Sequence, residues 1–88
     1  MLFMYIHTHS SERCMADNPE RTNQLRSQLQ EAAQQAGIKF LGVYVAAHEH
    51  TIFSLIEADD LGALEKVLTP LTVWGDARLI PVTSMRDN

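Results

Sequence analysis

Residues 38–60, IKFLGVYVAAHEHTIFSLIEADD, contain two apolar runs separated by one short polar turn. The runs 38–47 and 51–57 are rich in β-branched and aromatic residues, which favour strands, and the turn at 48–50 is short enough to join them as a hairpin. Asp59 and Asp60 follow at the place where a helix N-cap is expected. This stretch therefore predicts a strand, a turn, a second strand and the start of a helix.

The residues before this stretch predict another strand and another helix. An apolar run at 2–9 ends in two serines, which is typical of a strand that enters a loop. Pro19 follows Asp17 and Asn18, so either of these can cap a helix that has proline at its first position. Apolar residues then recur at helical spacing as far as 36, and Gly37 is a suitable C-cap. We expect a helix over 19–36.

After Asp60 the chain predicts a short helix and a last strand. Leucines and a valine recur at helical spacing from residue 61, and Pro70 helps to end that helix. Trp74, Gly75 and Asp76 are expected to form a turn. The run 78–83 is a strand, and its proline at 81 favours an edge position because proline has no N–H to donate to a second neighbour.

The order strand, helix, strand, strand, helix, strand is typical of an α+β domain of ferredoxin-like βαββαβ type. Such a domain has a four-stranded antiparallel sheet with two helices on one face. We expect a single domain over residues 1–88 with the spatial strand order 4-1-3-2. In that order the first and third strands are antiparallel neighbours. The end of the first strand, at residues 7–9, then meets the start of the third strand, at residues 50–51.

Composition excludes some classes of partner. The chain has 11 acidic and 7 basic residues and no basic stripe, so a nucleic-acid surface is not expected. No segment approaches the roughly 20 apolar residues that a membrane helix needs, and the first residues lack the basic lead of a signal peptide. One cysteine allows no intrachain disulfide and suits a reducing compartment. We expect a cytoplasmic protein with neither a nucleic-acid nor a membrane partner.

All the histidines and the single cysteine lie near two turns of the chain. Imidazole and thiolate are ligands that transition metals favour, and residues 7 and 9 of a strand point to one side, about 6.5–7 Å apart. We expect one metal site at that edge of the sheet, with ligands His7, His9, Cys14 and His50. His48 or Glu49 could substitute or support. A thiolate combined with imidazoles suits copper or zinc.

Other interpretations of these residues remain open. Cys14 can be a buried filler with no chemistry, and the histidines of the turn can simply face solvent. The chain can instead be a small enzyme in which His7 is the general base of an apolar cavity, with Glu57 or Tyr44 as its partner. A third alternative is a structural or regulatory dimer whose histidines have no special role.

The first strand also indicates a homodimer. Both of its alternating sets are apolar, Leu2, Met4 and Ile6 on one side and Phe3 and Tyr5 on the other. Two helices cover only one face of a four-stranded sheet, so the other face is expected to be apolar and uncovered. Pairing two such faces would bury it.

This pattern resembles the small dimeric α+β barrel proteins of ferredoxin-like fold. That group includes uncharacterised domains, antibiotic-biosynthesis-type monooxygenases, muconolactone isomerases and small nickel-binding proteins. The nearest likeness is to uncharacterised and nickel-responsive members, through HTH at 7–9 and TIFSLIEADD at 51–60. The resemblance implies homodimerisation and binding of nickel or another divalent ion at His7 and His9. Cys14 and AHEH at 47–50 are not part of that pattern, so copper, nickel and zinc all remain candidates.

Overall fold

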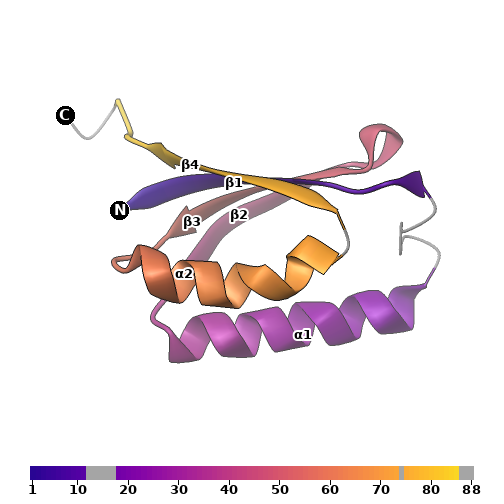
Figure 1. Ribbon diagram of the computed structural model, residues 1–88, viewed down its shortest axis with the longest axis horizontal. Coiled ribbons are helices and arrows are strands. Elements are labelled where there is room, and N and C mark those ends of the chain that lie inside the picture. The colour runs from indigo at the N-terminus through magenta and orange to yellow at the C-terminus, as the bar shows by residue number, and fades with distance from the viewer. Residues whose placement is uncertain (12–17, 74, 86–88) are drawn as a thin grey trace.

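The computed structural model describes residues 1–11, 18–73 and 75–85 and shows the elements in the expected order (Figure 1). An antiparallel sheet has the strand order β2-β3-β1-β4. Both helices lie on the same face of the sheet (Figure 1). The ferredoxin-like fold and the strand order 4-1-3-2 are confirmed. The elements are β1 (Leu2–Thr8), α1 (Pro19–Gln35), β2 (Lys39–Ala46), β3 (Thr51–Glu57), α2 (Leu61–Leu68) and β4 (Asp76–Val82).

Side-chain and glycine caps set the helix ends. Asn18 is the N-cap of α1, and its side-chain oxygen accepts a hydrogen bond from the Arg21 N–H at 3.2 Å. Gly37 follows the helix with φ of 72°, a left-handed conformation that favours glycine. Asp60 caps α2 by accepting from the Gly62 N–H at 2.9 Å. A 3-10 helix, η3 (Thr69–Val73), then leads toward β4.

The core lies between the sheet and the helices. Alternate residues of β1, namely Phe3, Tyr5 and His7, face the helices and are buried. Their partners on β3 include Ile56, which is fully buried beside Phe3. The buried hydrophobic residues are Phe3, Tyr5, Ala33, Ile38, Ile56, Ala58, Leu64, Val67 and Leu68. A core of this size is modest, so burial of a further surface would add useful stability.

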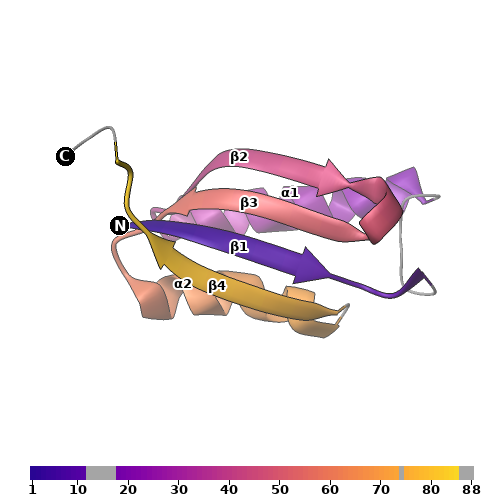
Figure 2. The same cartoon turned by 90° about the horizontal axis from the view of Figure 1, so that it is seen from above.

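The opposite face of the sheet is mainly apolar along its middle, and none of the described helices lies on it (Figure 2). We call it the outer face. On the two central strands, Ile6 lies opposite Phe53, and Met4 lies opposite Leu55. Met4 also pairs with Ile80 of β4. The larger side chains in the middle of the outer face are those of Leu2, Met4, Ile6, Tyr44, Phe53, Leu55, Arg78, Ile80 and Val82, and polar residues lie at its ends, namely Thr8, Lys39, Thr51, Glu57 and Asp76.

One irregularity changes which side chains of β2 point outward. Phe40 pairs with Ile56, but Gly42 pairs with the next residue of β3, Leu55, so Leu41 is an extra residue in β2. Such a β-bulge reverses the alternation of the residues that follow it. Tyr44 therefore lies on the outer face, where its ring covers Gly42.

The other edge of the sheet is β4, which pairs only with β1. Pro81 is thus tolerated in it, as expected for an edge strand. The strand begins at Asp76, two residues earlier than the sequence predicted, because Asp76 extends the pairing to Thr8. Trp74 of the expected turn lies outside the described residues. No helix in the described parts of the chain is long and apolar enough to cross a membrane.

Candidate metal centre

Hydrogen bonds attach the end of β1 to the turn before β3. The hydroxyls of Thr8 and Thr51 lie 3.4 Å apart, and Thr51 Oγ1 donates to the Glu49 carbonyl at 2.9 Å. One residue further, the His9 N–H donates to the His50 carbonyl at 3.1 Å. The pairing of the two strands therefore continues past β1 and places His9 beside His50.

An unusual backbone conformation shapes this turn. The chain forms a 3-10 helix over Ala47–Glu49, and His50 closes it with φ of 50° and ψ of 42°. The His50 N–H donates to the Ala47 carbonyl at 3.3 Å. His50 is the one non-glycine residue with positive φ in the described chain. This conformation is uncommon outside glycine, although histidine adopts it more readily than most residues do.

Three imidazole rings form a row at this edge of the sheet. The ring centroids of His7 and His9 are 5.5 Å apart, and those of His9 and His50 are also 5.5 Å apart. Two imidazoles on one ion have centroids roughly 5 Å apart, since each metal–nitrogen bond is about 2.0–2.1 Å long. Each neighbouring pair therefore has about the spacing of two ligands that share an ion. We call these residues the histidine row.

Each histidine of the row has a buried ring nitrogen without a hydrogen-bond partner among the described residues. These atoms are His7 Nδ1, His9 Nε2 and His50 Nδ1. A buried polar atom left unpaired costs about 1–3 kcal/mol, and folded proteins rarely tolerate several together. The row is therefore suited to a ligand that pairs with imidazole nitrogen.

The protonation pattern of His7 follows from one contact. His7 is 4% exposed, and its Nε2 lies 3.3 Å from the Leu71 carbonyl of η3. A carbonyl can only accept, so Nε2 carries the proton and the neutral ring has its lone pair on Nδ1. That lone pair is the one a metal would use, and a carbonyl that fixes a histidine in this way is a common support for a metal ligand.

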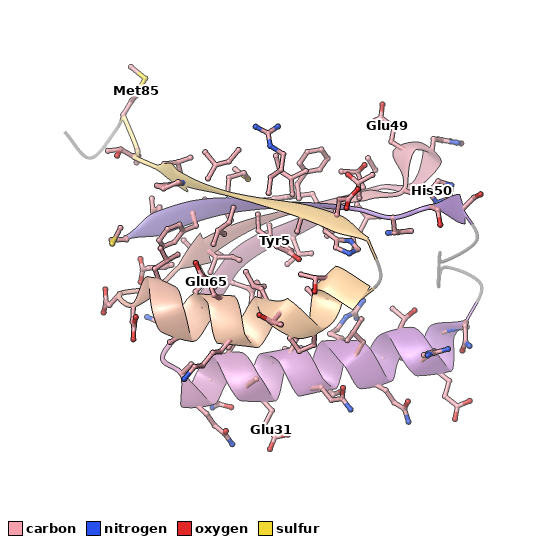
Figure 3. All side chains as sticks on the ribbon, in the orientation of Figure 1. Tyr5, Glu31, Glu49, His50, Glu65 and Met85 are labelled. Atoms are coloured by element: carbon pink, nitrogen blue, oxygen red, sulfur yellow. The ribbon has the colours of Figure 1, made fainter. Side chains whose placement is uncertain are left out.

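The structure brings together three of the four predicted ligands, His7, His9 and His50. Cys14 lies outside the described residues. His48 and Glu49 are exposed in the turn, and Figure 3 shows Glu49 projecting outward from it. Within residues 1–11, 18–73 and 75–85, no three His, Cys, Asp or Glu side chains form a ready-made metal site. The three rings are therefore a row of adjacent pairs, and a shared ion would require them to turn.

The residues suggested as partners of His7 in an enzyme lie elsewhere. Glu57 pairs with Leu2, at the opposite end of β1 from His7. Tyr44 is on the outer face and is 68% exposed, because the bulge at Leu41 reverses its direction. The structure therefore provides no carboxylate or phenol from these two residues beside His7.

Two neighbours of His7 were missed by sequence reasoning. The Tyr5 ring stacks against His7, with centroids 6.3 Å apart and an interplanar angle of 27°. Their spacing of two residues on one strand was a signal that could have revealed this pair. The Leu71 carbonyl belongs to the backbone of a distant segment, so no residue type in the sequence indicates it.

The surroundings of His9 favour its neutral imidazole. Burial lowers the pKa of His9 below its ordinary value, and positive charge on His7 or His50 lowers it further. His9 is thus available as a neutral ligand at lower pH than an exposed histidine would be. In contrast, burial raises the pKa of Tyr5 to about 12, so its hydroxyl stays protonated.

Acidification should destabilise the metal-free protein through His9. Its pKa is lowered in the folded state, so the unfolded chain, with a histidine pKa of about 6.5, takes up the proton first. The stability that neutral His9 contributes is fully present above a pH of about 6.5. It is lost as the pH falls from there toward the lower pKa that His9 has in the folded protein. Urea unfolding at neutral and mildly acidic pH should show a smaller loss of stability in His9→Asn than in the wild type. An equal loss in both proteins would contradict this role of His9.

Comparisons with known proteins agree with the fold. Residues 1–88 match the family described as "Domain of unknown function (DUF3303)". The structure is similar to the crystal structure of SCO4226 from Streptomyces coelicolor A3(2), with a TM-score of 0.63 and 16% sequence identity. That alignment covers 96% of this chain and 100% of the other. At this identity the likeness shows the fold alone. The search of curated proteins found no match.

Proposed function

We propose that this chain, which belongs to the family described as "Domain of unknown function (DUF3303)", is a homodimeric protein that binds a transition-metal ion for sensing, storage or delivery. The observation that carries the proposal is the set of three buried ring nitrogens, on His7, His9 and His50, that have no hydrogen-bond partner within the described parts of the chain. A metal ion pairs with the lone pairs of such nitrogens and would remove the cost of leaving them unsatisfied. Cys14 is proposed as a fourth ligand.

The donor set limits the choice of ion. Imidazoles suit zinc, copper and nickel, whereas calcium and magnesium require oxygen ligands. The thiolate of Cys14 would favour copper or zinc, and nickel is supported by the resemblance to nickel-responsive proteins of similar fold. The hydrogen bond from His7 Nε2 to the Leu71 carbonyl favours metal binding through Nδ1 of that ring.

Metal uptake tests the proposal. Protein without an affinity tag would be dialysed against copper, nickel or zinc, and metal per chain would be measured by mass spectrometry. We expect close to one ion per chain for at least one metal, and an affinity at least about tenfold lower in His9→Asn, because His9 is next to both other rings. Cys14→Ser should also weaken binding.

The matched control is His48→Asn, which changes an exposed histidine of the same turn and should leave the affinity unchanged. Wild-type protein that takes up none of the three metals would overturn the proposal. Equal losses in His9→Asn and His48→Asn would show that binding is nonspecific.

The homodimer is proposed to form through the outer face. Its side chains in the middle of the two central strands, including Ile6, Phe53 and Leu55, are apolar and face away from both helices. Apolar faces of this kind are characteristic of protein interfaces. Pairing two copies would bury the face and supplement a modest core.

A further inference from the structure

A cleft next to the histidine row, which it touches through Tyr5, lies between the sheet and the segment that contains α2 and η3. Its volume is about 280 Å³, just below the range of about 300–1,000 Å³ for small-molecule sites. No histidine of the row lines it. Tyr5, Ala77 and Leu79 line it from the sheet, and Glu65, Leu68, Thr69 and Thr72 line it from the helical side.

Tyr5 supplies a polar group without a partner at this cleft. The side chain is 4% exposed, and its buried hydroxyl has no hydrogen-bond partner among the described residues. Figure 3 shows Tyr5 between the sheet and α2. A tyrosine hydroxyl can donate a hydrogen bond, and this one has no acceptor among the described residues. An unpaired buried hydroxyl costs about 1–3 kcal/mol, which a bound hydrogen-bond acceptor would offset.

The other polar groups of the cleft accept hydrogen bonds. Thr69 Oγ1 donates its proton to the Glu65 carbonyl at 2.6 Å, and Thr72 Oγ1 donates to the Thr69 carbonyl at 2.7 Å. Both hydroxyl protons are thus in use, and only oxygen lone pairs remain. Glu65 adds a carboxylate and is the one charged residue among the described residues that line the cleft. The cleft therefore favours a positively charged donor over an anion.

We propose that this cleft binds a small organic cation: a protonated amine on a short apolar body that also carries a hydrogen-bond acceptor. The ammonium group pairs with the carboxylate of Glu65 and with the threonine oxygens. The apolar body packs against Leu68 and Leu79, and the acceptor takes the hydrogen bond from Tyr5 once the side chains that cover its buried hydroxyl move aside. Carboxylate and phosphate ligands are disfavoured because the described lining offers them no cationic partner.

A pair of matched probes tests this proposal. The first is 4-methoxyphenethylamine, which combines an ammonium group, an aromatic body and an ether oxygen. The second is 3-(4-methoxyphenyl)propionate, which has a carboxylate in place of the amine. Each would be titrated into the protein and followed by backbone amide NMR, with a chelator present so that metal binding has no influence. We expect the amine to shift the amides of Thr69, Ala77 and Leu79, and the carboxylate to bind at least about tenfold more weakly.

Protein variants test which residue binds the ammonium group of the probe and which binds its methoxy oxygen. Glu65→Gln should weaken binding of the amine about tenfold, whereas Glu31→Gln on α1, away from the cleft (Figure 3), should not change it. Tyr5→Phe should remove the preference of the cleft for the methoxy probe over its 4-ethyl analogue. The proposal is overturned if the cleft amides do not shift, if both probes bind equally, or if Glu65→Gln has no effect.

Discussion

Gly75→Ala is expected to lower the free energy of unfolding by about 3 kcal/mol, the upper part of the range for overpacking a tight site. A Cβ at position 75 would overlap the carbonyl oxygen of Thr8 and would lie 2.9 Å from the Cα of His9. These are backbone atoms and cannot move aside by side-chain rotation. The end of β1 would have to shift, and the His9 ring would shift with it. Metal affinity should therefore fall together with stability.

Gly62→Ala is the matched control, because it is the same change in an open position. A Cβ there meets only the Asp60 side-chain oxygen at 3.4 Å, an ordinary contact. Alanine is favoured over glycine in a helix by up to about 1 kcal/mol, so this variant should be as stable as the wild type or more stable. Urea unfolding of the three proteins measures the difference. Similar stabilities for the two variants would show that β4 and β1 do not approach each other at Gly75 as described.

Leu55→Lys is expected to convert the proposed dimer into a monomer. Leu55 lies on a central strand and faces outward, next to Met4 and Gly42. In a symmetric dimer the substitution would place two ammonium groups in one apolar interface, where an unpaired charge is strongly disfavoured. We expect the dissociation constant to rise at least about 100-fold, equivalent to roughly 2.8 kcal/mol. Sedimentation equilibrium over a range of protein concentrations measures it.

Val43→Lys is the control for this experiment. Val43 pairs with the buried Ser54, so it lies on the helix side of β2, and it is 55% exposed. A lysine there should leave the dimer intact. If Val43→Lys dissociates the dimer and Leu55→Lys does not, the interface lies along the edge at β2. A wild-type protein that is monomeric at high micromolar concentration would rule out the proposed dimer.

The fold could be predicted from the sequence because its signals are local. The apolar runs on either side of residues 48–50, the caps at Asn18 and Asp60, and Gly37 each depend on a few adjacent residues. The element order then restricts the topology to few choices, and the strand order β2-β3-β1-β4 follows. That topology was also enough to place His9 beside His50.

Details of the site could not be predicted where they depend on tertiary contacts. Strict alternation from Phe40 would have put Tyr44 on the helix face with His7, but the extra residue at Leu41 reverses it. The left-handed conformation of His50 belongs to a turn whose sequence has no glycine. The hydrogen bond from His7 to Leu71 joins residues 64 positions apart. None of these features has a local sequence signal.

The bulge in β2 also affects aggregation. β2 is an edge strand, and Leu41, Val43 and Val45 are 50%, 55% and 67% exposed along it. A long, flat, apolar edge strand is a template on which further chains add, and fibrils can grow from it. An extra residue bends and twists such a strand, which interrupts the regular row of N–H and C=O groups that an incoming strand needs. Leu41 therefore hinders edge-to-edge polymerisation at the strand whose apolar side chains would otherwise promote it.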